Sequence, residues 1–228
     1  PVRIGPILAG LSTAAHSVVI DWFKIRLYVD PEPTTGLGSE EASADATISF
    51  RSAESAGVGS GNLTINKPTG TVQNDVMIGT IGVRPETVTI TPPAGWTLVR
   101  RIDNANANAN SLAVYYKVAG ASEPASYTWM ISTNTGAAGG IQTFSGVDTA
   151  NPIDVENGQT TSNGLDHSTP SIVTTVDNTM LVTSHTFSSA ATWTPPTGMT
   201  EGFDVSGGLQ ATEGHYALQT TAGATGAK

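Results

Sequence analysis

The chain has 228 residues, with 10 Lys and Arg against 19 Asp and Glu, so its formal net charge is −9. This balance argues against nucleic acid or an anionic membrane surface as a partner, because both attract clustered cations. The absence of cysteine excludes disulfides, cysteine-based zinc sites and thiol nucleophiles. Only 13% of the residues are charged, and small and polar residues dominate, which favours an all-β, surface-exposed protein over a helical one.

The most strand-like stretch lies near the start of the chain, at residues 18–29. Apolar side chains alternate there with charged or amphipathic ones, which predicts a strand with one buried face. The apolar set consists of Val19, Phe23, Ile25, Leu27 and Val29. Residues 35–46 are small, acidic and rich in structure breakers, as in a linker. We therefore predict an N-terminal extension over residues 1–34, a linker over 35–46 and a domain over 47–228.

The domain reads as a series of short strands separated by Gly, Pro, Asn and Asp, the spacing expected of a β-sandwich. No run has a helical period, and no segment approaches the roughly 20 apolar residues of a membrane span. The predicted fold is an all-β, jelly-roll-like antiparallel β-sandwich. Its expected strands are 47–52, 62–66, 75–83, 96–102, 111–119, 125–131, 139–145, 170–176, 178–187, 199–205 and 210–220.

The domain also contains an internal repeat. "TPPAG" begins at Thr91 and "TPPTG" at Thr194, 103 residues later, and the same offset relates Met77 to Met180 and the "AGA" at 119–121 to that at 222–224. This pattern predicts two related Greek-key halves that share one domain, because neither half buries its apolar face alone. The first half continues into a strong strand, "SYTWMIS", whereas only Thr225–Lys228 follow the second "AGA". The second half is therefore expected to be one strand short.

Several segments together resemble the Thr/Gly-rich β-sandwich modules of bacterial surface proteins and phage tail-associated proteins. They include "TPPAGWTLVRRID", "LAVYYKVAGASEPASYTW" and "FSGVDTANPIDV", and the resemblance covers roughly residues 47–228. It implies a structural or adhesive role more than an activity. In that family the module continues past "AGATG" into a last strand that contains a Trp. The N-terminal "DWFKIRLYVDP" resembles that closing strand.

Three interpretations of the N-terminal strand remain open from the sequence. The chain is a piece of a tandem array that keeps the last strand of the previous module, or the strand folds back into its own sandwich, or it is donated to a neighbouring copy. The breaker-rich residues 32–46, about 15 in all, span up to about 50 Å when extended, so they permit the second and the third. Head-to-tail donation does not close on itself and therefore produces a filament.

The predicted function is accordingly a structural subunit of an extracellular filament at a cell surface or in a virion. It would polymerise with copies of itself through Val19, Phe23, Ile25, Leu27 and Val29. The alternative is a glycan- or cell-surface-binding module of a phage tail protein or bacterial adhesin.

Residues that would carry chemistry are sparse. His16, His167, His185 and His215 have no metal-binding spacing, and His185 is expected to be a satisfied sandwich residue. There is no G-x-S-x-G motif, so we do not expect an enzyme. No organic cofactor is expected. The one candidate ion site is an acidic turn with oxygen ligands suited to Ca²⁺, formed by Asp148, Asn151 and Asp154 with Glu156 nearby. Trp96, Trp129 and Trp193 are expected to pack in the fold rather than bind sugars.

Overall fold

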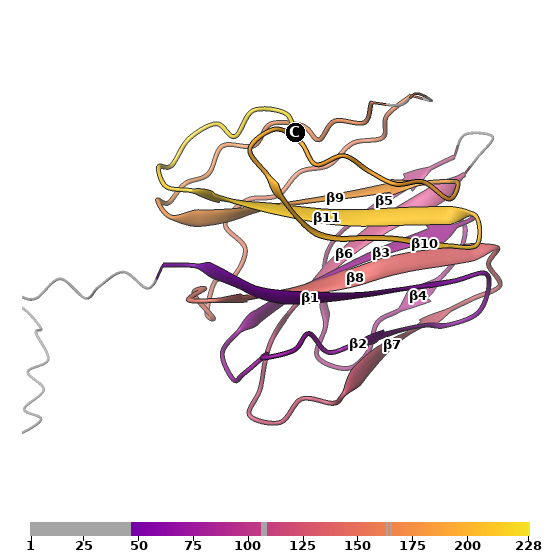
Figure 1. The fold of residues 1–228 in the computed structure, drawn as a ribbon, viewed down its shortest axis with the longest axis horizontal. Coiled ribbons are helices and arrows are strands. Elements are labelled where there is room, and N and C mark those ends of the chain that lie inside the picture. Colours follow the sequence, from indigo (N-terminus) through magenta and orange to yellow (C-terminus); the bar gives the residue numbers. More distant parts are fainter. Residues whose placement is uncertain (1–46, 106–108, 163, 165) are drawn as a thin grey trace, which may run out of the picture. The chain divides into compact units, whose positions relative to one another are not determined.

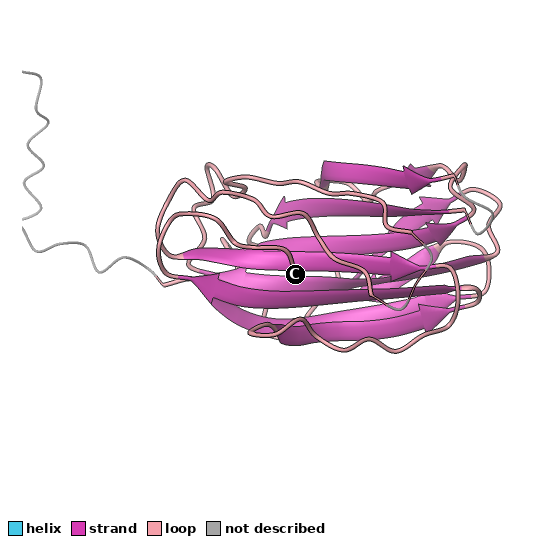
Figure 2. Cartoon of the chain, turned by 90° about the horizontal axis from the view of Figure 1, so that it is seen from above, coloured by secondary structure: helices cyan, strands magenta, loops and turns pink. Residues whose placement is uncertain are grey.

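The computed structural model describes residues 47–105, 109–162, 164 and 166–228. The predicted extension and linker, including the strand at 18–29, lie outside these residues. The described part of the chain forms strands and loops without a helix, which confirms the all-β class (Figure 2). The strands are β1 (Ser49–Val58), β2 (Leu63–Asn66), β3 (Val76–Arg84), β4 (Ile90–Thr91), β5 (Thr97–Asn104), β6 (Asn110–Val118), β7 (Ser126–Ile131), β8 (Gly136–Ser145), β9 (Thr179–Phe187), β10 (Thr200–Gly207) and β11 (Gln210–Gln219).

The described strands pair antiparallel in three sheets. A five-stranded sheet has the order β1-β8-β3-β6-β5, and two three-stranded sheets have the orders β10-β11-β9 and β2-β7-β4. In Figure 1 β1, β8, β3 and β6 of the five-stranded sheet lie across the middle, with β9 and β11 above them and β2 and β7 below, and β5 is drawn at the height of β9 and β11. The antiparallel β-sandwich is therefore confirmed, with a central sheet that is covered on both faces.

The sequences of β3 and β8 explain why these strands occupy the centre. β3 reads VMIGTIGVR and β8 reads GAAGGIQTFS, and nearly every residue of both strands is buried. Met77 and Ile81 point into the lower core, whereas Val76 and Ile78 point toward the upper sheet. A strand that is buried on both faces loses the apolar–polar alternation and becomes continuously apolar or small. The early part of β8, Gly136–Ala138, was not predicted for this reason.

The lower core is aromatic. Trp96, Tyr115, Tyr127 and Trp129 are all buried in it, together with the aliphatic residues of β2 and β3. The rings of Trp96 and Trp129 lie 5.2 Å apart, and those of Trp96 and Tyr127 meet edge-on at 5.1 Å. The packing role predicted for Trp96 and Trp129 is thus the one they have.

The internal repeat is visible as a repeated three-stranded unit. β3, β5 and β6 pair in the order β3-β6-β5, and β9, β10 and β11 pair in the matching order β9-β11-β10. A β-bulge lies between Leu98 and Arg100 in β5, and another lies 103 residues later, between Glu201 and Phe203 in β10. The preceding turns also match, since Gly95 and Gly198 have φ values of +83° and +81°. The two units lie in different sheets, one stacked above the other.

One predicted strand, at 170–176, is absent. These residues form only an isolated bridge, from Val173 to Ala224, with flanking backbone hydrogen bonds to the last residues of the chain. Val173 is 65% exposed. Although the segment contains β-branched residues, it pairs only with the last residues of the chain, so the propensity alone does not produce a strand.

Candidate functional site

The upper sheet ends at β9, which pairs with β11 on one side only. In the first repeat unit the equivalent strand, β3, pairs with β6 on one side and with β8 on the other. Among the described strands of the second unit, no counterpart of β8 lies beside β9. The free edge of β9 is therefore the position that β8 occupies in the first unit.

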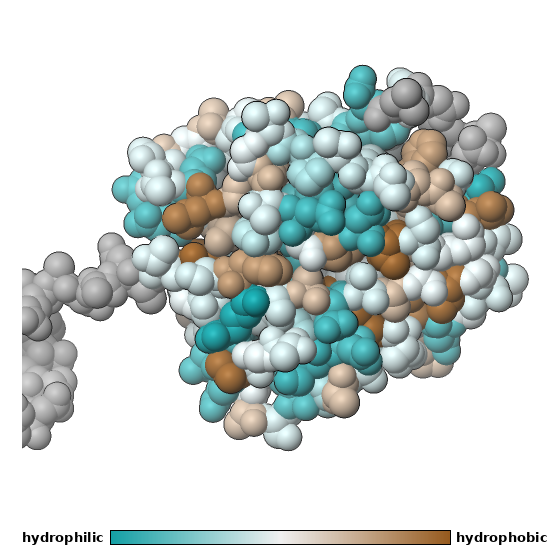
Figure 3. Space-filling view, viewed as in Figure 1, coloured by the Kyte–Doolittle hydropathy of each residue, from teal (hydrophilic) through white to brown (hydrophobic). Residues whose placement is uncertain are grey.

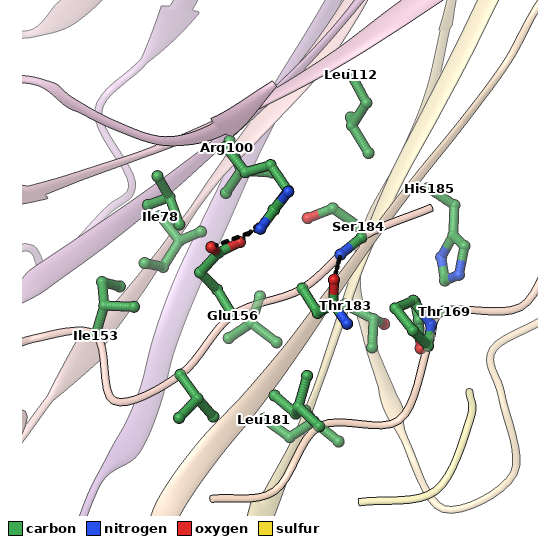
Figure 4. Close-up of a pocket in the computed structure, with 18 of the residues that line it drawn as sticks. Ile78, Arg100, Leu112, Ile153, Glu156, Thr169, Leu181, Thr183, Ser184 and His185 are labelled. Atoms are coloured by element: carbon green, nitrogen blue, oxygen red, sulfur yellow. Dashed lines mark hydrogen bonds and ion pairs between the residues drawn. The ribbon is translucent and has the colours of Figure 1, made fainter. Parts of the chain in front are cut away.

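A groove runs along this free edge (Figure 4). Its volume is about 310 Å³, and eight consecutive residues of β9, Thr179–Thr186, line it. Side chains from both faces of β9 contribute, which places the groove beside the backbone of the strand. Residues 152–161 and 167–170, in the connection between β8 and β9, form the opposite wall.

The floor of the groove is the upper face of the central sheet. Its apolar side chains come from β3, β5 and β6 and include Ile78, Ile102, Leu112 and Val114. Ile102 pairs with Leu112, and Arg100 pairs with Val114, in the β5–β6 ladder, so these four side chains share one face. β10 packs over β8 and β1, β11 packs over β8 and β3, and β9 reaches β6 and β3. The β5 side of the sheet is therefore covered by the groove and its wall rather than by a strand.

An ion pair ties the wall to the floor. The guanidinium of Arg100 in β5 donates to both carboxylate oxygens of Glu156, with Nη2 to Oε1 at 2.8 Å. The hydrogen bonds and charge of Glu156 raise the pKa of Arg100 above its ordinary value. The side chains are 40% and 36% exposed, so solvent screens the pair and weakens its contribution to holding the wall.

These features suit the addition of an extended strand. The free edge of β9 presents a row of backbone N–H and C=O groups, and pairing with a further strand provides their hydrogen-bond partners. Alternate side chains of that strand would lie on the apolar floor. By contrast, the face drawn in Figure 3 carries its apolar residues in small patches separated by polar ones.

The structure describes only some of the residues that were predicted to form sites. Val19, Phe23, Ile25, Leu27 and Val29 lie outside the described residues, so their role as a donor strand stays a prediction.

The acidic turn predicted to bind Ca²⁺ follows β8. The carboxylate of Asp148 accepts hydrogen bonds from the backbone N–H of Ala150, at 2.9 Å, and from the amide of Asn151, at 3.4 Å. These bonds lower the pKa of Asp148. Asp154 instead accepts from the N–H of Thr175 at 2.8 Å and from its hydroxyl, which lowers its pKa too. Asp148 and Asn151 thus contact each other, whereas Asp154 contacts Thr175. Calcium binding stays a prediction.

A buried cluster of ionisable side chains lies outside the sites that the sequence predicts. His185 lies opposite Glu213 in the β9–β11 ladder, and His215 is two residues further along β11. His185 is buried in a strand as expected, but its partner is a carboxylate. The signal was the E-x-H spacing at 213–215, and only the strand register connects it to His185.

Among the described residues, no helix has the length and apolar character that a membrane crossing needs. No protein-family model matches the chain, and no curated protein matches it in sequence. A search of solved structures found a chain from the baseplate tripod of bacteriophage Tuc2009. It is 14% identical, with 60% of this chain and 83% of that chain covered and a TM-score of 0.26. A score this low does not establish a common fold, so we take the function from this chain's own residues.

Proposed function

We propose that the protein is a structural subunit that binds the N-terminal strand of a neighbouring copy beside β9. Residues 18–29 would complete the upper sheet, as β8 completes the first repeat unit, and would run antiparallel to β9. The product is an extracellular filament at a cell surface or in a virion, and the chain has no catalytic role. The free edge of β9 along an apolar groove is the observation that carries this proposal.

The predicted donor strand matches the groove in length and pattern. β9 has nine residues, and the segment at 18–29 is long enough to pair with all of them. If its backbone pairs with β9, Phe23, Ile25 and Leu27 face the floor and Lys24 and Arg26 face solvent. Each large apolar side chain that leaves water contributes roughly 1.5–3 kcal/mol, and the new ladder hydrogen bonds add to this.

Donation to a second copy and return to the same chain use the same contacts, so the test must separate them. The natural chain has no cysteine, which makes directed cross-linking clean. One full-length variant carries Leu181→Cys on β9, and a second carries Arg26→Cys in the donor segment. Lys24→Cys provides a second donor position in case the register differs. Thr64→Cys, exposed on β2 in the lower sheet, replaces Leu181→Cys as the control.

The single-cysteine variants are mixed under mild oxidation and analysed by non-reducing gel and peptide mass spectrometry. Donation predicts mixed dimers of Leu181→Cys with a donor variant at several times the yield obtained with Thr64→Cys. If only a double-cysteine chain cross-links, and within itself, the strand completes its own sandwich and the filament proposal is wrong. If neither link forms, residues 18–29 are not the occupant of the groove.

The alternative role, binding glycans at a surface, has less support. Trp96 and Trp129 are buried in the lower core and present no ring face to a sugar. Binding of surface polysaccharide that saturates in a glycan-array screen would favour this alternative.

A further inference from the structure

Three ionisable side chains are buried together on the face of the upper sheet that points away from the central sheet. Their exposed fractions are 8% for His185, 2% for Glu213 and 0% for His215. Nδ1 of His185 lies 2.9 Å from Oε1 of Glu213, and Nε2 of His215 lies 2.7 Å from Oε2. One ligand atom from each residue lies within 4.8 Å of the others.

The strand register places these side chains. Residues 213 and 215 share one face of β11, and His185 lies directly across the ladder from Glu213. Trp193, in the connection between β9 and β10, covers the cluster, with its ring 5.8 Å from that of His185. His185 also lines the groove along β9, which gives the cluster a route to solvent.

The cluster contains more buried polar atoms than the hydrogen bonds within it satisfy. Both ring nitrogens of each histidine and Oε2 of Glu213 are buried without an aligned hydrogen bond, and the ring nitrogens at ion-pair distance from Glu213 are Nδ1 of His185 and Nε2 of His215. The ion pairs of Glu213 within the described residues are to the two histidines, with no Lys or Arg among them. Buried polar atoms without partners are costly and rare, so such a group calls for an additional partner.

We infer that His185, Glu213 and His215 bind one divalent transition-metal ion of the Zn²⁺ class. Two imidazole nitrogens and one carboxylate oxygen form a common ligand set for Zn²⁺, with the fourth position left for water. Ca²⁺ and Mg²⁺ are poorly suited because they prefer sets made of oxygen alone. With bonds of about 2.0–2.1 Å, tetrahedral ligand atoms lie roughly 3.3 Å apart, so small side-chain rotations suffice to admit the ion.

The ion would link β9 to β11. It would hold the edge strand in register and rigidify one wall of the groove. Because the ligands lie on the outer face of the sheet, this inference does not depend on whether a donor strand binds. Its test therefore uses the protein without any assembly step.

The experiment uses the full-length chain without an affinity tag, stripped with EDTA and dialysed. Zn²⁺ should bind at one equivalent per chain by calorimetry and raise Tm, while Ca²⁺ and Mg²⁺ at the same concentration leave Tm unchanged. Co²⁺ should produce the visible absorption bands of a four-coordinate site, a readout that does not depend on stability. His215→Gln and Glu213→Gln should each weaken Zn²⁺ binding at least tenfold. His16→Gln, a histidine of the N-terminal segment, should leave binding unchanged.

Circular dichroism of each variant in EDTA tests whether it still folds. If a variant is unfolded, the Co²⁺ spectrum and the stoichiometry of the unaltered chain decide. Absence of both the Tm shift and the Co²⁺ bands would show that the cluster is a hydrogen-bonded network without a metal. Full retention of Zn²⁺ binding in the folded Glu213→Gln and His215→Gln variants would place the ion elsewhere and overturn the assignment.

Discussion

The ring of Phe203 in β10 lies against the backbone of Gly140 in β8. A Cβ atom added to Gly140 would stand 2.5 Å from the nearest ring carbon, closer than real Cβ contacts allow. Glycine at this position therefore sets how closely the upper sheet approaches the central one, and Phe203 fills the space that the missing side chain leaves.

Gly140→Ala should destabilise the domain, because a methyl group there forces the Phe203 ring out of its position. Overpacking of this kind costs about 1–3 kcal/mol. Urea denaturation measures the loss, and Gly59→Ala is the matched control because a Cβ there meets nothing within 4 Å. Equal stability of the two variants would mean that the sheets separate easily at this point.

The repeated turns allow backbone strain to be measured without crowding. Gly198 has a φ of +81°, and a Cβ there meets no atom within 4 Å, whereas at Gly95, with a φ of +83°, it would stand 2.7 Å from Nζ of Lys117. Gly198→Ala should therefore lower the free energy of unfolding only by the strain of an alanine in the left-handed conformation, about 1–2 kcal/mol. Gly95→Ala should cost the same, plus whatever movement of the flexible Lys117 requires. A cost for Gly198→Ala no larger than that for Gly59→Ala, by thermal or urea denaturation, would contradict this account.

Glu123 predicts a pH dependence of stability. Burial raises the pKa of this carboxyl, but hydrogen bonds from the Gly120 N–H and the Tyr127 hydroxyl, both at 2.7 Å, and the Lys117 ammonium at 3.2 Å outweigh it. The net pKa lies below its ordinary value of 4.5. The unfolded chain therefore takes up this proton first, so the stabilisation is complete above pH 4.5 and is lost as the pH falls through the lowered pKa.

Glu123→Gln should thus be less stable than the natural chain at neutral pH, and the difference should shrink as the pH falls below about 4.5. Urea denaturation at a series of pH values measures it. Glu201→Gln, which removes an exposed carboxylate on β10, controls for the change in net charge. A difference that stays constant through the acid range would show that the Glu123 contacts act through packing alone.

The sequence predicts strands well where one face is buried and the other is wet. The alternation in β7, where Tyr127, Trp129 and Ile131 are buried between exposed neighbours, is of this kind. The sequence predicts strands less well where the signal does not come from neighbouring residues. The Gly–Ala start of β8 lacks alternation because both faces are covered, and β4 is only two residues long.

The parts of the candidate sites that escaped prediction depend on register and stacking. The repeat at an offset of 103 indicated two related units, but not that one unit stacks above the other and leaves the edge of β9 free. Likewise, His185 and Glu213 are 28 positions apart in the chain and meet only through the β9–β11 ladder. An antiparallel register is set by all the pairs of a strand together, so isolated spacing rules miss such a cluster.

The Arg100–Glu156 pair predicts how the wall of the groove behaves. Both side chains are more than a third exposed, so Arg100→Ala should leave the global free energy of unfolding nearly unchanged. Locally the effect should be larger, because Glu156 loses the contacts that tie residues 152–161 to β5. Hydrogen exchange followed by mass spectrometry should then show faster exchange in residues 152–161, with the amides of β3 unchanged. Arg51→Ala, which removes the ion pair with Asp75 away from the groove, is the matched control and should leave exchange at 152–161 as it is. If exchange there is the same in Arg100→Ala as in the natural chain, the apolar contacts of Ile153 and Val155, not the ion pair, hold the wall against the floor.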